Sequence, residues 1–306
     1  MLKSSFHYIL WLLMFFPLAN WAMQVGPNEV QAQLIQVQQE INLLKQHFHI
    51  QENIQTSEIK KAEFPSRYSW QKTYEILFKI NILREKLDLP IIALPSQQPS
   101  VEMTSLHVYE QVRRILTELE LLKFHLNIEE KTALVSSLSG KTTTDNFNLL
   151  NQISYQLDSV NQVALTPSMV FSQAMRIYED INVLLETLKI DDQTIPPAKS
   201  SGVTSKDNFE IGLSLLKEIK RLHRIAGIEG TDLYALKFPD NQVITPTEVF
   251  SLMGIILAEL QALKGYLGLK YVFTPLTDFY YDRISGDVQQ ILGWSLRKIQ
   301  LIQSLD

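Results

Sequence analysis

Residues 166–190 read TPSMVFSQAMRIYEDINVLLETLKI, and this stretch decides the fold. Counted from Val170, apolar residues recur at offsets 4, 7, 11, 14 and 18, which is the spacing of one face of an α-helix. Thr166 and Pro167 form a helix-start signal, because Thr caps a helix and Pro suits its first turn. The stretch therefore predicts an amphipathic helix. Its apolar pattern ends with an aliphatic residue, Ile190, at offset 20.

The same pattern occurs in four copies. The copies begin at Val30, Val108, Val170 and Val249, and their aliphatic residues at offset 20 are Ile50, Ile128, Ile190 and Leu269. A second helix type lies between the copies, with apolar faces that start near Trp70, Phe147, Phe209 and Tyr281. The sequence therefore predicts four tandem two-helix repeats, with about eight helices in total.

Each helix of such a repeat has one apolar face, which a single pair cannot bury. We therefore expect an all-α fold in which the four repeats stack as a helical-repeat array or close into a compact helical bundle. Periodicity alone does not decide between these architectures. Residues 23–306 are expected to form a single domain, and residues 191–206, with two consecutive prolines, are the preferred place for an internal boundary.

The composition excludes several classes of protein. Of 306 residues, 45% are apolar, which suits a globular core. The 28 Lys and Arg residues against 33 Asp and Glu give a net charge of -5, so no basic excess is present to neutralise phosphates and we expect no nucleic-acid binding. The chain has no Cys, which excludes disulfides, thiolate metal sites and thiol catalysis.

The first 22 residues have the order of a secretory signal peptide. Lys3 precedes the apolar run YILWLLMFFPL at residues 8–18, which is too short to span a membrane, and small residues follow it. We expect cleavage after Ala22 and a location in a bacterial periplasm, because a eukaryotic secreted protein of this size would more often carry disulfides. An uncleaved anchor is the alternative, since Asn20 is large for the position three residues before the cut. No membrane span is expected in the mature chain.

Every copy of the first helix type has a carboxylate at offset 10, beside its apolar positions. These carboxylates belong to Glu40, Glu118, Asp180 and Glu259. One interpretation is an acidic ladder that binds cations or a basic partner. The other, which we favour, is one structural tie repeated four times, in which each carboxylate accepts hydrogen bonds from a neighbouring helix or loop. The lysines at offset 15, Lys45, Lys123 and Lys264, are poorly spaced for ion pairs with these acids within one helix and are expected to be solvated.

No other motif predicts a cofactor, a metal or a catalytic residue. His47 and His125 share offset 17, but Thr187 and Tyr266 occupy that position in the other copies, so we expect no symmetric metal site. Residues 139–142, SGKT, resemble the end of a phosphate-binding loop but lack its first glycine. We therefore expect neither an enzyme nor a cofactor.

Most aromatic side chains fall at helical spacing and are expected in the core. Residues 273–281, FTPLTDFYY, are the exception, because their aromatic residues exceed what one helix start needs. Aromatic side chains are enriched at protein interfaces. Phe273, Phe279, Tyr280 and Tyr281 are therefore candidate contacts with a partner.

Together these features favour a non-enzymatic, exported helical-repeat protein of the periplasm that acts as a protein-binding scaffold, for example as a subunit of a cell-envelope assembly such as a secretion apparatus. Its expected partners are other envelope proteins, and its oligomeric state is left open. The alternative is a periplasmic carrier that binds a small apolar ligand between helices. An enzyme with a site dispersed over the loops is a third hypothesis.

Overall fold

The computed structural model describes residues 25–51, 63–135, 137–229, 243–276 and 278–305. Within these residues lie eight helices and no strand, which confirms the all-α, helical-repeat prediction. The helices of the first type are α2 (Pro27–His47), α4 (Ser105–His125), α6 (Pro167–Thr187) and α8 (Pro246–Tyr266), and those of the second type are α3 (Ser66–Lys86), α5 (Thr143–Asn161), α7 (Ser205–Ala226) and α9 (Ser285–Ile299). The predicted signal peptide, residues 1–22, lies outside the described residues.

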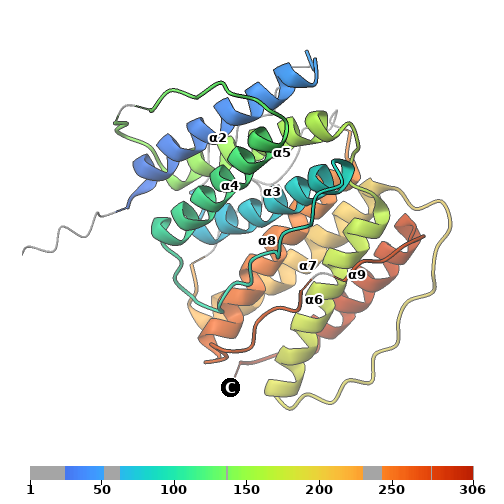
Figure 1. The fold of residues 1–306 in the computed structure, drawn as a ribbon. Helices are drawn as coiled ribbons and strands as arrows, with labels where there is room; N and C mark the ends of the chain where they lie inside the picture. The colour runs from blue at the N-terminus through green and yellow to red at the C-terminus, as the bar shows by residue number, and fades with distance from the viewer. Residues whose placement is uncertain (1–24, 52–62, 136, 230–242, 277, 306) are drawn as a thin grey trace, which may run out of the picture.

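The eight helices are arranged as two four-helix bundles, α2 to α5 and α6 to α9 (Figure 1). In the first bundle, α2 and α3 each pack against both α4 and α5. In the second, α6 and α7 each pack against both α8 and α9, so the connectivity of the first bundle is repeated. The bundles meet where α3 packs against α8. The main neighbours of each helix therefore come from the other repeat of its bundle.

The predicted apolar faces form the two cores. In every helix of the first type, the leading Val and the residues at offsets 4, 7, 11 and 14 are buried. Phe64, Tyr68, Phe78 and Phe147, which belong to the first half of the chain, join the apolar cluster of the second bundle. Phe78 of α3 and Phe250 of α8 place their ring centroids 5.2 Å apart, so the two cores meet at the contact between these helices.

All four helices of the first type end in the same backbone motif. The residue at offset 19 has a positive φ: His49 55°, Asn127 56°, Lys189 54° and Gly268 76°. The next N–H, at offset 20, donates to a carbonyl in the last helical turn, as from Ile190 to Leu185 at 2.9 Å. This is the bonding of a Schellman motif, which often brings an apolar residue back onto the helix end. The motif explains the aliphatic residue at offset 20 in each copy.

Two helices of the second type begin at capping boxes. Thr142 caps α5 and Thr204 caps α7, and each hydroxyl accepts from the backbone N–H of an aspartate three residues later. The carboxylates of Asp145 and Asp207 in turn accept from the backbone N–H of the two threonines, at 2.8 and 2.7 Å. Both boxes satisfy N–H groups that the helix itself leaves unbonded.

One of the described helices, α8, is long and apolar enough to cross a membrane. Most of it is buried, because it packs against α3, α6 and α7. The central helix of a water-soluble bundle has the same length and composition, so the expectation of no membrane span stays a prediction.

Candidate functional site

The four carboxylates at offset 10 all lie against cations of the chain itself. The pairs are Glu40 with Lys123 at 2.7 Å, Glu118 with Arg84 at 3.2 Å, Asp180 with Lys264 at 2.7 Å and Glu259 with Lys220 at 2.7 Å. Each pair joins two different helices, which is the geometry of the structural interpretation rather than of an open ladder. Among the described residues, no group of three His, Asp or Glu side chains could hold a metal ion.

The prediction that the lysines at offset 15 are solvated is wrong, since Lys45, Lys123 and Lys264 are all buried. The spacing within one helix does not matter, because the ion pairs form between helices. Lys123 of α4 reaches the acid of α2, and Lys264 of α8 reaches the acid of α6. The lysines thus complete the contacts that hold each bundle together.

Burial favours the neutral form of both of the two most deeply placed acids, but their pKa values are shifted in opposite directions. It raises the pKa of Asp180, and the ammonium of Lys264 and the hydroxyl of Thr274 offset this only in part. At Glu259 burial also favours the neutral form, but a hydrogen bond from His223 and the cations of α3 and α7 outweigh it and hold the pKa of this carboxyl well below its usual range. Glu259 is therefore an anionic centre where α3, α7 and α8 meet.

Asp180 also links the acidic positions to the predicted aromatic contacts. The segment after α8 runs past α6 to the start of α9 (Figure 1). The Thr274 hydroxyl donates to Asp180 at 2.6 Å, and Arg176 of α6 donates to the carbonyl of Pro275 at 2.9 Å. The sequence did not indicate a role for Thr274, because the Thr-Pro pair that begins other helices here precedes no helix.

The four predicted aromatic contacts fall into two groups. Phe273, Phe279 and Tyr281 are exposed, by 44%, 63% and 78%. Tyr280 is half-buried, and its ring packs edge-on against Phe171 of α6, with centroids 5.0 Å apart. The segment is thus fastened to α6 while neighbouring aromatic side chains face the solvent. Two more exposed apolar residues of this segment, Tyr271 and Leu276, were not among the predicted contacts.

Phe279, Tyr280 and Tyr281 line an apolar groove between the two bundles, which we call the bundle groove. Its volume is about 440 Å³. Its other lining residues come from α3, from the connection after α3 and from the start of α6, and they include Phe78, Ile82, Ile91, Ile92, Leu94 and Met169. Phe273 is not part of it. The sequence could not predict these walls, because the groove exists only where two bundles pack together.

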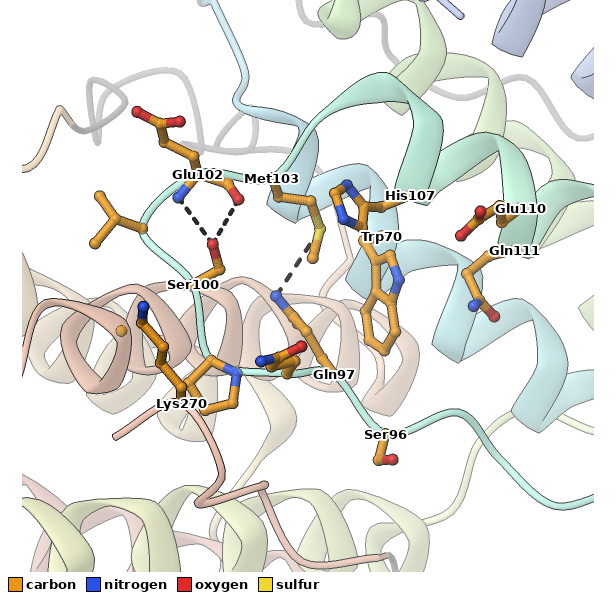
Figure 2. A pocket seen from close by; sticks show the side chains of 14 residues that line it. Trp70, Ser96, Gln97, Ser100, Glu102, Met103, His107, Glu110, Gln111 and Lys270 are labelled. Atoms are coloured by element: carbon orange, nitrogen blue, oxygen red, sulfur yellow. Dashed lines mark hydrogen bonds between the residues drawn. The ribbon is translucent and has the colours of Figure 1, made fainter. Parts of the chain in front are cut away.

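A second cavity, of about 600 Å³, is more polar and lies on the connection between α3 and α4. Figure 2 shows Lys270 on one side of it and His107 and Glu110 on the other, with Gln97 and Trp70 between them. The connection can lie this close to α8 because of Gly265, where a Cβ atom would meet the backbone of Ser100 at 2.8 Å or less.

Two polar side chains of this second cavity are engaged within the chain. Gln97 accepts from Gln71 at 2.9 Å. The hydroxyl of Ser100 donates to the carbonyl of Glu102 at 2.6 Å (Figure 2). The connection is therefore held by a bond to α3 and by a bond of its own. Of the two cavities, only the bundle groove contains residues that the sequence marked as contacts.

The chain matches no protein-family profile, no curated protein and no solved structure.

Proposed function

We propose that this protein is a non-enzymatic, exported helical-repeat protein of the periplasm that works as a scaffold by binding other envelope proteins. One observation carries the proposal. Phe279 and Tyr281 are exposed at the edge of an apolar groove, in a segment that is fastened to α6. Exposed apolar patches mark binding surfaces, and aromatic anchors dominate the energy of many interfaces.

The fastening matters because ordering a loop during binding costs free energy. Thr274 and Pro275 are held by their bonds to α6. Further along, Ser168 of α6 accepts from the backbone N–H of Arg283 at 2.9 Å. Such a segment presents its aromatic side chains with little ordering left to do. A subunit of an envelope assembly, such as a secretion apparatus, would use a surface of this kind.

The alternative function, a carrier of a small apolar ligand, would use the same groove. Its volume is within the range of about 300–1,000 Å³ that small-molecule sites occupy. The exposed rim favours the scaffold, because a carrier must enclose most of its ligand. Mass spectrometry of the intact purified protein separates the two, since a carrier should retain a small molecule.

Site-specific cross-linking in the native cell tests the scaffold proposal. A photo-reactive amino acid is placed at Phe279 or Tyr281, and at Phe124 as the control, because Phe124 of α4 is 83% exposed but lies outside the groove. We expect the same partner protein at the two groove positions and not at the control. No adduct at either groove position, or the same adducts at all three, would contradict the proposal.

Substitution gives the energetic counterpart of this test. Phe279→Ser combined with Tyr281→Ser should lower affinity for the cross-linked partner about 30-fold or more, because loss of an aromatic hot spot costs about 2 kcal/mol. Phe124→Ser should leave the affinity unchanged. Release of the protein from intact cells by osmotic shock checks the proposed location.

A further inference from the structure

The chemistry of the bundle groove indicates what kind of segment it binds, an inference that rests on the proposed function. Most of its lining is aliphatic or aromatic, and it contains no Lys or Arg. The charged lining residues are Glu85, at the end of α3, and Asp282, just before α9. The groove thus combines an apolar floor with two acids.

The neutral polar groups of the groove are already engaged. The side chain of Asn81 donates to the carbonyl of Ile92 and accepts from its N–H, both at 2.8 Å. The hydroxyl of Ser172 donates to the carbonyl of Ser168, and Thr166 caps α6. An occupant therefore finds apolar surface inside the groove and few free hydrogen-bonding groups other than the two acids.

Glu85 and Asp282 are exposed, and neither forms an ion pair with a cation in the described part of the chain. Neighbouring cations are engaged elsewhere. Arg84 donates to Glu118 and to the carbonyl of Pro90, and Lys86 donates to the carbonyl of Asn161. The rim at this position is consequently negative and available to a cationic partner.

One cation, Arg283, follows Asp282 directly in the sequence, and it is engaged with aromatic rings. Burial and the nearby carboxylate of Asp278 raise the pKa of Tyr280, against the guanidinium of Arg283. That guanidinium lies over the rings of Phe171 and Tyr280, 5.0 and 5.8 Å from their centroids. Arg283 is therefore held over these two rings by stacking.

We propose that the bundle groove binds a segment of a partner protein in which apolar side chains are flanked by Lys or Arg. The apolar side chains fill the groove beside Phe279 and Tyr281, and the basic residues pair with Glu85 and Asp282 at the rim. Apolar burial supplies most of the affinity, and the two acids supply selectivity and a salt-dependent association rate.

Labelled synthetic peptides test this selectivity. Three peptides share one apolar core and differ only in flanks of lysine, serine or glutamate, and their affinity for the purified protein is measured by fluorescence anisotropy at low and high salt. We expect the lysine-flanked peptide to bind best and the glutamate-flanked peptide worst. The difference should shrink at high salt, because exposed charges are screened.

The protein variants are matched by charge. Glu85→Gln combined with Asp282→Asn should lower the affinity for the lysine-flanked peptide by about two- to fivefold for each acid removed. The affinity for the serine-flanked peptide should stay unchanged. Asn suits position 282, because Asp282 has a φ of 56° and Asn tolerates that region. The control, Glu120→Gln with Glu210→Gln, removes the same charge from exposed positions outside the groove and should change nothing.

A third variant blocks the groove itself. Ala93 is exposed on the groove wall, so Ala93→Trp should abolish binding of all three peptides without unfolding the protein. The inference is overturned if the glutamate-flanked peptide binds equally well, if the control variant matches the rim variant, or if the purified protein already holds a small apolar molecule there. Cross-linking of a partner at Phe279 together with no peptide preference would overturn this inference and leave the proposed function intact.

Discussion

Three buried charged side chains of α3 show how far a single residue depends on its surroundings. Lys72 and Glu75 lie 2.9 Å apart, and Lys79 lies 2.8 Å from Asp158 of α5. Burial alone would raise the pKa of Glu75, but the two ammonium groups and the bonds from Lys72 and Ser154 lower it from an ordinary value of 4.5 to about 2. Glu75 thus remains ionised and compensates two buried cations.

The pattern of α3 alone does not predict this burial. In an isolated helix the charged face of α3 would meet solvent, as such faces usually do. Here α5 covers one side and α8 of the other bundle covers the next. The sequence did predict that the acids at offset 10 border the apolar face, because that position follows from one helix. It could not predict the cations that meet them, because those lie on other helices.

Glu75→Gln is expected to destabilise the protein by about 3–5 kcal/mol near neutral pH, because it leaves the buried ammonium of Lys72 without its anion and removes one of the two anions beside Lys79. A lowered folded-state pKa stabilises above the unfolded value and loses that effect as pH falls through the folded value. The difference in free energy of unfolding between the wild type and Glu75→Gln should therefore become smaller as the pH falls from 4.5 to 2. Urea denaturation at a series of pH values measures it.

Glu218→Gln is the matched control for this experiment. Glu218 also pairs with a cation three residues away, Arg221 at 2.9 Å, but both side chains are partly exposed on α7. A pair of that kind contributes about 1 kcal/mol or less. Equal losses from the two substitutions would show that the charges of α3 are better solvated than their positions indicate.

At the scale of the element, the sequence predicts the regular helices well and the last one less well. The pattern predicted that the apolar face of the last helix starts near Tyr281, whereas α9 spans Ser285–Ile299. Residues 278–284 are instead bound to α6 by the ring contact of Tyr280 and the backbone bonds of Arg283. Contacts with another element thus override local periodicity, and the same contacts create the aromatic edge of the groove.

The helix ends offer a test of the repeated motif. Lys189 occupies the position of positive φ that Gly268 fills in the fourth copy, and its side chain is exposed. A left-handed backbone conformation destabilises a non-glycine residue by about 1–2 kcal/mol, and glycine avoids this cost. Glycine also has greater conformational entropy in the unfolded chain, which offsets about half of the gain. Lys189→Gly should therefore stabilise the protein by about 0.5–1 kcal/mol, measured as a higher urea midpoint.

The same change inside a helix should have the opposite sign. Lys217 is exposed in the middle of α7, and Lys217→Gly should destabilise by about 0.5–1 kcal/mol because glycine is a poor helix former. If Lys189→Gly also destabilises, then Lys189 does not hold the left-handed conformation that ends α6.

At the scale of the whole molecule, the apolar periodicity of the sequence does not predict which helices pack against each other. The spacing of Val170, Ala174 and Ile177 shows which face of α6 is buried but not that α8 and α9 cover it. The bundle groove depends on the same information, since α3 and α6 come together only when the bundles dock. The sequence therefore located one edge of the candidate site, through Phe279 to Tyr281, and neither of its walls.

The docking of the bundles predicts how the chain unfolds. Because Phe250 of α8 is buried against Phe78 of α3, and the charges of Lys72, Glu75 and Lys79 are covered by both bundles, separating the halves would expose apolar surface and buried charge together. We therefore expect one cooperative transition, as a single domain over residues 23–306 requires. Hydrogen exchange with mass spectrometry should give peptides of α2 and of α9 the same denaturant midpoint.

Phe250→Ala distinguishes coupled bundles from independent ones. The substitution should lower the free energy of unfolding by about 3–5 kcal/mol. It should also lower the denaturant midpoint of both bundles equally, because the lost side chain lies where the two cores join. Leu34→Ala in α2 lies inside the first bundle only, yet it should also shift both midpoints if the halves unfold as one. Should Leu34→Ala lower the midpoint of α2 while that of α9 stays in place, the bundles are separate folding units and the contact between α3 and α8 is weaker than its burial implies.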